Sequence, residues 1–241
     1  TRRAFATLAL AALAPPVAPL DASVAPLDAS VAAQTPRPPA PTGPERFEKE
    51  IRAYEDADRK NPPPTGGIVF VGSSSVRMWK SLDADFPGLG VLNRGFGGSV
   101  LADATHYAGR IVVPYRPRQV VLYAGDNDLA AGVSPRQILL HFHAFVQRLR
   151  RDLPAVPVVF LAVKPSPSRA RLLDAARETN ARIRTYAYLN DHIAYVDLFT
   201  PMLGPDGQPR PELFLADKPH LTADGYALWK GIVAPFLRPR P

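Results

Sequence analysis

From residue 68 onward, short continuous runs of apolar residues alternate with segments whose apolar residues recur every three or four positions. The apolar runs cover 68–71, 120–123, 158–163 and 193–196, and a shorter run near 91–92 adds a fifth. Runs that are apolar at every position, and not only at alternate ones, are typical of strands buried on both faces, as in a parallel sheet. The pattern therefore predicts five parallel strands.

The segment before the first run has the spacing of a helix. Phe47, Ile51 and Tyr54 are separated by four and three residues, which places their side chains on one face. A helix is therefore expected from residue 45 to just before Pro62, because the residue before a proline disfavours helical backbone.

Helices are also predicted between and after the later strands. The best marked begins at Pro135, where Ser134 can cap the first amides and proline suits the first turn. Further helices are expected over 172–188 and 223–237. Strands that alternate with helices indicate an α/β protein, a three-layer α/β/α sandwich with a five-stranded parallel sheet, flavodoxin-like, with right-handed crossovers.

Residues 1–44 lack this alternation. Arg2 and Arg3 precede an apolar run of about ten residues, which is too short to span a bilayer and suits the core of a signal peptide. The sequence predicts a signal peptide over 1–33, of twin-arginine or general secretory type, a proline-rich linker over 34–44 and a folded domain over 45–241. Export would make the protein periplasmic or secreted, with no stable membrane insertion after removal of the signal.

The amino-acid composition excludes cysteine chemistry and argues against nucleic-acid binding. The chain has no cysteine, which excludes disulfides, thiolate nucleophiles and thiolate metal sites. The formal net charge is +7, but the arginines are scattered and form no basic run interleaved with aromatic residues. We therefore expect no nucleic-acid partner.

Glycine and polar residues follow the first three predicted strands. Ser74 follows the first strand, Gly98 the short second and Asn127 the third. In parallel α/β sheets, ligands bind beyond the carboxyl ends of the strands, so these three residues are expected to converge on one edge. Asp217 and His220, three residues apart near the end of the chain, add a carboxylate and an imidazole.

Four short motifs occur in a fixed order: GSSS at 72–75, GFGG at 95–98, GDND at 125–128 and DKPH at 217–220. In these motifs, residues 68–237 resemble the SGNH hydrolases, also called the GDSL esterase and lipase family. The resemblance implies the SGNH-hydrolase fold for the domain over 45–241 and ester hydrolysis with no cofactor and no metal ion. The chain departs from the family at Ser73, where aspartate is usual.

The resemblance implies a role for each matching position. Ser74 would be the nucleophile, His220 the base and Asp217 the partner of the base. The oxyanion hole would consist of the backbone amides of Ser74 and Gly98 and the side-chain amide of Asn127. A serine hydroxyl can attack an ester carbonyl when an imidazole takes its proton, and donors that hold the oxyanion accelerate this step. The expected function is that of a serine carboxylic-ester hydrolase that forms an acyl-enzyme on Ser74.

The residues next to these have other expected roles. Ser73 occupies the place of the usual aspartate, and Ser75 is expected to begin the following helix and to cap its backbone amides. Glycine is expected at position 98 because the backbone there must approach the substrate without a Cβ atom.

Five further charged or titratable residues are assigned structural roles. Asp126 and Asp128 are expected to cap the segment that follows them and not to hold a metal ion. For Arg94 a structural ion pair is expected, and contact with a substrate carboxylate or sulfate is the alternative. His141 and His143 fall on different sides of the predicted helix, so a shared metal ion is not expected.

Two other classes of function fit parts of the pattern. A non-catalytic carbohydrate-binding module could retain this fold, but it would be expected to lose at least one of Ser74, Asn127, Asp217 and His220. A nucleotide binder of flavodoxin type would need a phosphate-cradling loop, and GFGG is not followed at the right distance by a third glycine. The partner is expected to be a small-molecule ester or an ester of a glycan or lipid, with acetylated glycans, lysophospholipids and short-chain esters all open.

Overall fold

The structure is a computed structural model that describes residues 43–239. The expected signal peptide over 1–33 and nearly all of the expected linker lie outside the described residues, so these assignments and the location stay predictions. Among the described helices, none has both the length and the apolar composition that a membrane crossing requires.

One parallel sheet of five strands forms the centre of the domain, as predicted. The strands are β1 (Ile68–Gly72), β2 (Val91–Gly95), β3 (Gln119–Tyr123), β4 (Val158–Leu161) and β5 (Ile193–Val196). Their order in the sheet is β2-β1-β3-β4-β5. Every residue of β1, β3 and β4 is buried, which explains why their sequences are apolar without interruption.

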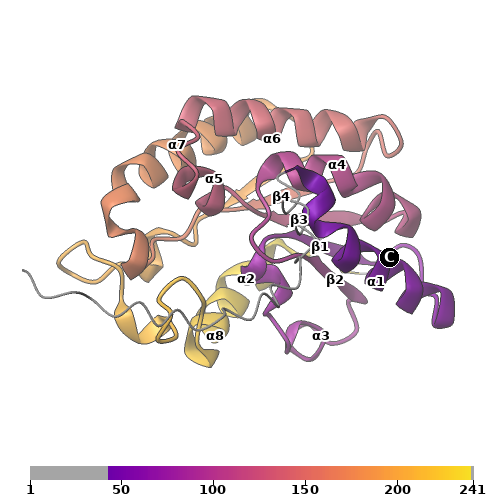
Figure 1. Cartoon of the computed structure of the whole chain (residues 1–241), viewed down its shortest axis with the longest axis horizontal. Helices are drawn as coiled ribbons and strands as arrows, with labels where there is room; N and C mark the ends of the chain where they lie inside the picture. The colour runs from indigo at the N-terminus through magenta and orange to yellow at the C-terminus, as the bar shows by residue number, and fades with distance from the viewer. Residues whose placement is uncertain (1–42, 240–241) are drawn as a thin grey trace, which may run out of the picture. The chain divides into compact units, whose positions relative to one another are not determined.

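Helices cover both faces of the sheet (Figure 1), which confirms the predicted three-layer α/β/α sandwich. On one face lie α4 (Leu101–Ile111), α6 (Pro135–Arg150) and α7 (Leu173–Leu189), and on the other lie α2 (Ser74–Arg77), α3 (Leu82–Asp85) and α8 (Ala223–Val233). Two further helices are α1 (Glu48–Lys60), which packs against α4, and the short α5 (Asp126–Ala130), which follows β3. The remaining turns are 3-10 helices: η1 (Pro44–Phe47), η2 (Val113–Tyr115), η3 (Pro167–Leu172), η4 (Thr200–Met202), η5 (Pro211–Leu213) and η6 (Ala234–Phe236).

The predicted element boundaries are right to within a few residues. The cap of α6 is confirmed, because the Ser134 hydroxyl accepts the amide of Gln137 at 3.3 Å. The last helix ends at Val233, four residues earlier than predicted, and continues as η6. Pro235 explains this end, because proline has no N–H for the next α-helical hydrogen bond.

A cluster of aromatic side chains joins the sheet to α8. Trp79 and Trp229 are fully buried, with ring centroids 6.0 Å apart. Beside them, the Tyr226 hydroxyl donates to the carbonyl of Ser75 at 2.9 Å. The last helix is therefore bonded directly to the segment that follows β1.

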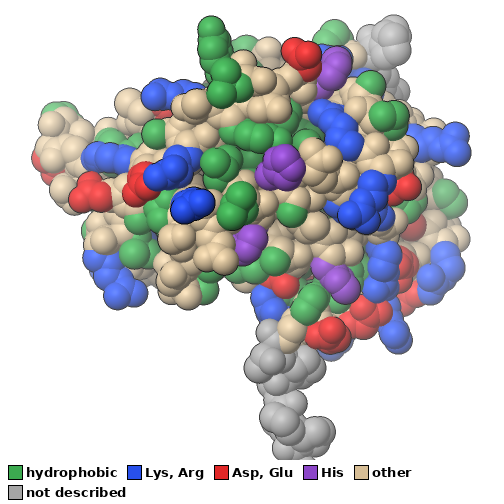
Figure 2. Space-filling model, turned by 90° about the horizontal axis from the view of Figure 1, so that it is seen from above, with side chains coloured by type: hydrophobic (Ala, Val, Ile, Leu, Met, Phe, Trp, Pro, Cys, Tyr) green, Lys and Arg blue, Asp and Glu red, His purple; other side chains and the backbone are tan. Residues whose placement is uncertain are grey.

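Basic side chains are distributed over the surface. On the face seen in Figure 2, Lys and Arg side chains are interspersed with hydrophobic and uncharged ones and do not form one continuous patch. This is the distribution that the scattered arginines of the sequence predict.

Candidate active site

The chain turns sharply at the end of β1. Gly72 has a φ of +134°, and a Cβ atom there would lie 1.9 Å from the carbonyl oxygen of Tyr123, so only glycine fits. The next amide, that of Ser73, donates to the same carbonyl at 3.0 Å. Since α2 begins at Ser74, this side chain stands at the carboxyl edge of the sheet.

Ser74, His220 and Asp217 form one hydrogen-bonded chain. The Ser74 hydroxyl lies 3.0 Å from Nε2 of His220, and Nδ1 of the same ring lies 2.5 Å from Oδ2 of Asp217. The hydrogen bond from His220 lowers the pKa of Asp217, so that carboxyl is ionised at neutral pH. An ionised acceptor fixes the imidazole with its proton on Nδ1, which leaves Nε2 free to accept a proton from Ser74.

Local hydrogen bonds shape the loop that carries Asp217 and His220. Phe214 and Leu221 form an antiparallel bridge, and the Leu215 amide donates to the His220 carbonyl at 2.8 Å. Within the loop, the His220 amide donates to Oδ1 of Asp217 at 3.2 Å. The loop therefore holds the two side chains in contact before any substrate is bound.

Gly98 and Asn127 come from the neighbouring strands. The register pairs Gly72 with Gly95 on one side and with Tyr123 on the other, so the segments after β1, β2 and β3 leave the sheet at the same edge. The Asn127 side-chain amide donates to the carbonyl of Ser99 at 3.1 Å, which ties the asparagine to the segment after β2.

The backbone conformation supplies a reason for glycine at position 98 besides the predicted approach of a substrate. The φ of Gly98 is +79°, which side chains with a Cβ atom rarely adopt, whereas the space where a Cβ atom would stand is open. The backbone conformation by itself therefore favours glycine here, and the approach of a substrate to this position stays a prediction.

The three adjacent serines have distinct surroundings. Ser73 and Ser75 are buried, and Ser74 is partly exposed. The Ser73 hydroxyl has no hydrogen-bond partner among the described residues. The predicted role of Ser75 as the start and cap of the helix is wrong, because α2 begins at Ser74 and the Ser75 hydroxyl accepts a hydrogen bond from Lys164.

Lys164 is a buried cation beneath the site that the sequence reasoning missed. Its ammonium group donates to the Ser75 hydroxyl at 3.0 Å, to the Tyr123 hydroxyl at 2.9 Å and to Oδ2 of Asp126 at 2.8 Å. Burial lowers the pKa of Lys164, and the charge of Asp126 opposes this effect. An available signal was its position, since a lysine directly after a buried apolar run falls at the ligand-binding edge of the sheet.

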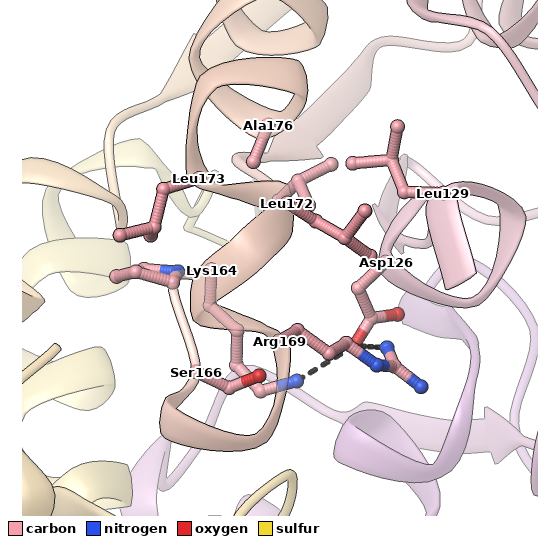
Figure 3. A pocket seen from close by; sticks show the side chains of 10 residues that line it. Asp126, Leu129, Lys164, Ser166, Arg169, Leu172, Leu173 and Ala176 are labelled. Carbon is pink, nitrogen blue, oxygen red and sulfur yellow. Dashed lines mark hydrogen bonds and ion pairs between the residues drawn. The ribbon is translucent and has the colours of Figure 1, made fainter. Parts of the chain in front are cut away.

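Arg169, on η3, is the second residue that was missed. Its Nη2 donates to Oδ1 of Asn127 at 2.8 Å, and its Nη1 lies 3.0 Å from Oδ2 of Asp126. Figure 3 shows the side chains of Lys164 and Arg169 directed at the Asp126 carboxylate. The same view shows the apolar side chains that line the adjacent pocket: Leu129, Leu172, Leu173 and Ala176. No motif marks Arg169, because arginines are common in the surrounding sequence.

The two aspartates beside Asn127 do not have the predicted partners. Asp126 pairs with Lys164 and does not cap α5. Asp128 caps a different helix from the one expected, since both its oxygens accept the amide of Leu101 at the start of α4, at 3.2 and 3.3 Å. Asp128 thereby connects the segment after β2 to that after β3.

Burial raises the pKa of Asp128 from its ordinary 3.8 to about 6, although the hydrogen bond from Leu101 opposes the shift. A raised carboxyl pKa means that the folded state prefers the protonated form, so stability falls as the pH rises from about 4 to 6. A shift of this size corresponds to a fall of about 3 kcal/mol in the free energy of unfolding once the pH is above both pKa values. His141, whose Nδ1 lies 3.8 Å from Oδ1 of Asp128, reduces the effect where it is protonated, and the nearby Asp126 charge increases it.

We expect Asp128→Asn to remove this pH dependence, because asparagine can still accept the Leu101 amide and carries no charge. The free energy of unfolding of the variant, relative to that of the unmodified protein, should increase between pH 4.5 and 7. Denaturant titrations at several pH values measure this difference, with the exposed Asp191→Asn as control. A difference that is constant over this range would contradict the assignment.

Arg94 has the predicted structural role. It is buried, its Nη2 pairs with Oδ1 of Asp58, and its Nε donates to the Tyr115 hydroxyl at 2.8 Å.

His141 and His143 face different groups. His143 contacts the Tyr186 hydroxyl, whereas Nδ1 of His141 lies near Oδ1 of Asp128, which agrees with their predicted placement on different sides of the helix. Within residues 43–239, no three His, Cys, Asp or Glu side chains lie together in a way that could hold a metal ion.

Residues 67–228 match the GDSL-like lipase/acylhydrolase family. No match was found among curated protein sequences.

Solved structures show the same fold. A GDSL-like lipase from Bacteroides thetaiotaomicron superposes with a TM-score of 0.67 at 22% identity, over 78% of this chain and 96% of that one. A member of the lipolytic protein G-D-S-L family from Veillonella parvula gives 0.60 at 19% identity, over 71% and 97%. A catalytic mutant of an acetylxylan esterase from Geobacillus stearothermophilus gives 0.53 at 13% identity, over 73% and 96%. At such identities the likeness shows the fold.

Proposed function

Because the chain belongs to the GDSL-like lipase/acylhydrolase family, a family of hydrolases that act on esters, we propose that it is a serine carboxylic-ester hydrolase with Ser74 as nucleophile. The observation that carries the proposal is the hydrogen-bonded chain from the Ser74 hydroxyl through His220 to Asp217, with distances of 3.0 and 2.5 Å. Such a chain is what a serine needs in order to lose its proton at the moment of attack.

The reaction has two halves. In the first, Oγ of Ser74 attacks the ester carbonyl carbon while Nε2 of His220 takes the hydroxyl proton. His220 then gives this proton to the departing alkoxide, the carbon–oxygen bond breaks, and the acyl group remains on Ser74. In the second half, His220 takes a proton from a water molecule that attacks the acyl carbonyl carbon. It then gives this proton to Oγ of Ser74 as the bond between the acyl carbon and Oγ breaks, and the carboxylic acid leaves. Asp217 stays ionised and stabilises the imidazolium that forms in each half.

Three groups are proposed to hold the negative oxygen of the tetrahedral intermediates: the backbone amides of Ser74 and Gly98, and the side-chain amide of Asn127. Support comes from their origin at one edge of the sheet and from the exposure of Gly98. The hydrogen bond from Asn127 to the Ser99 carbonyl holds the Asn127 amide next to the backbone that carries the Gly98 amide. Donors fixed before the reaction stabilise developing charge without reorganisation.

The non-catalytic carbohydrate-binding alternative has weaker support. Such a module needs neither a serine bonded to an imidazole nor a carboxylate behind that imidazole. The substrate in our proposal is a small-molecule ester or an ester of a glycan or lipid.

A fluorophosphonate probe tests the proposal directly. We expect stoichiometric loss of aryl-ester hydrolysis together with one adduct, on Ser74, located by peptide mass spectrometry. Excess ester substrate should slow the labelling, because both compete for the same hydroxyl. An active enzyme without any serine adduct would overturn the covalent mechanism, and an adduct on Ser73 or Ser75 would overturn the choice of nucleophile.

The same assay separates the substrate classes. Rates on aryl esters of increasing acyl length distinguish a short-chain esterase from an enzyme of long acyl chains. Acetate release from acetylated polysaccharides then tests glycan esters, with the Ser74→Ala variant as the blank.

A further inference from the structure

The hydrogen bonds of Asn127 fix which way its side-chain amide faces. A carbonyl oxygen can only accept, so the atom facing the Ser99 carbonyl at 3.1 Å is the amide nitrogen. A guanidinium can only donate, so the atom facing Arg169 at 2.8 Å is the amide oxygen. The two contacts agree on one orientation and exclude the flipped one.

This orientation leaves one N–H of Asn127 unused. The nitrogen carries two hydrogens, one of which is directed at Ser99, and no second acceptor is present in the described part of the chain. A flipped amide would turn its oxygen toward the Ser99 carbonyl and the developing oxyanion, and would repel both. The direction of this one amide therefore decides whether Asn127 helps or hinders the reaction.

Arg169 is itself held in place by a buried charge. Its Nη1 forms an ion pair with Oδ2 of Asp126 at 3.0 Å, without the geometry of a hydrogen bond, and the same oxygen accepts a hydrogen bond from Lys164. Asp126 is 6% exposed and Lys164 is 3% exposed, so water screens the pair that these two form little, whereas the Arg169 side chain is 23% exposed. The planar guanidinium directs one nitrogen to Asp126 and the other to Asn127, a fork that a lysine ammonium cannot reproduce.

We propose that Arg169 is a positioning residue for ester hydrolysis, which fixes the amide of Asn127 with its free N–H toward the oxyanion. This inference rests on the proposed function. Arg169 acts through Asn127 and does not itself contact the reacting atoms, so its removal should affect turnover more than substrate binding.

The test uses two substitutions at Arg169 in the full chain. Arg169→Met removes both contacts, and Arg169→Lys keeps a positive charge beside Asp126 but loses the fork. We expect kcat on an aryl ester to fall about ten-fold in both, less than the ~10²–10³ typical of removing an oxyanion donor, with KM nearly unchanged. Arg171→Met is the matched control, because Arg171 lies two residues away on the same turn and is exposed, and it should keep full activity.

A double-mutant cycle with Asn127 identifies the route of the effect. In an Asn127→Ala background, Arg169→Lys should cause no further loss of kcat, because the amide that it orients is gone. An equal further loss would overturn the inference by showing that Arg169 acts elsewhere. An increase in KM with kcat unchanged would also overturn it, since that result would assign Arg169 to substrate binding.

The outcomes separate this inference from the proposed function. If Ser74→Ala and Asn127→Ala both lower kcat strongly and the two Arg169 variants do not, the proposed function stands and the inference fails. If Ser74→Ala keeps full activity, the proposed function itself fails. Melting temperatures of all variants are measured in parallel, and Arg169→Lys decides the matter should Arg169→Met fail to fold.

Discussion

Replacing Ser74 by alanine is expected to lower kcat for ester hydrolysis by ~10³-fold or more and to leave the melting temperature nearly unchanged. The substitution removes the hydroxyl that is proposed to attack the ester, whereas the partly exposed side chain contributes little to packing. Steady-state kinetics on a short aryl ester, together with thermal unfolding, measure both effects.

The two neighbouring serines supply the controls. Ser73→Ala should keep full activity and should not lower stability, because it removes a buried hydroxyl that has no hydrogen-bond partner among the described residues. Ser75→Ala should also keep most of the activity, but it removes one of the acceptors of Lys164 and should cost about 1 kcal/mol of stability. A loss of turnover in either control as large as that in Ser74→Ala would show that the nucleophile has been assigned to the wrong serine.

The largest loss of stability is expected for Lys164→Met. The substitution leaves the buried Asp126 carboxylate without its nearest cation, and breaking a buried pair from one side typically costs about 3–5 kcal/mol. Because Arg169 still faces Asp126, the lower end of this range is expected, which corresponds to a fall in melting temperature of about 10 °C for a domain of this size.

The exposed Lys80→Met is the matched control for this prediction and should unfold at the unmodified temperature. Adding Asp126→Asn to Lys164→Met should restore part of the lost stability, because the carboxylate that has lost its lysine is then replaced by a neutral amide. If Lys164→Met melts at the same temperature as the unmodified protein, the buried network contributes nothing to stability, and Lys164 must be retained for another reason.

Local patterns were sufficient to predict the framework of this protein. The five strands follow from uninterrupted apolar runs such as 120–123, since a strand covered on both faces has no position for a polar side chain. Ser74, Asp217 and His220 were named from motifs, and the structure brings them into one hydrogen-bonded chain. Their catalytic roles stay predictions until activity is measured.

Long-range partners were what the sequence did not reveal. Ser75 was assigned to its own helix because capping is a local interaction, whereas its actual partner, Lys164, lies on a segment 89 positions away. Asp128 was likewise expected to cap the residues after it and instead caps α4. A single sequence shows the propensity of each residue for its neighbours in the chain and contains no direct record of which segments meet in space.

The hydrogen bond from Tyr226 to the Ser75 carbonyl makes the geometry of the site depend on the docking of the last helix. Ser74 and His220 are 146 positions apart, and the histidine belongs to a loop that directly precedes α8. The Tyr226 bond and the packing of Trp229 on Trp79 attach this helix to the segment after β1. A partly folded chain whose sheet has formed but whose last helix has not docked would hold Ser74 without its base. The proposed pair of nucleophile and base would therefore be complete only in a chain whose last helix has docked.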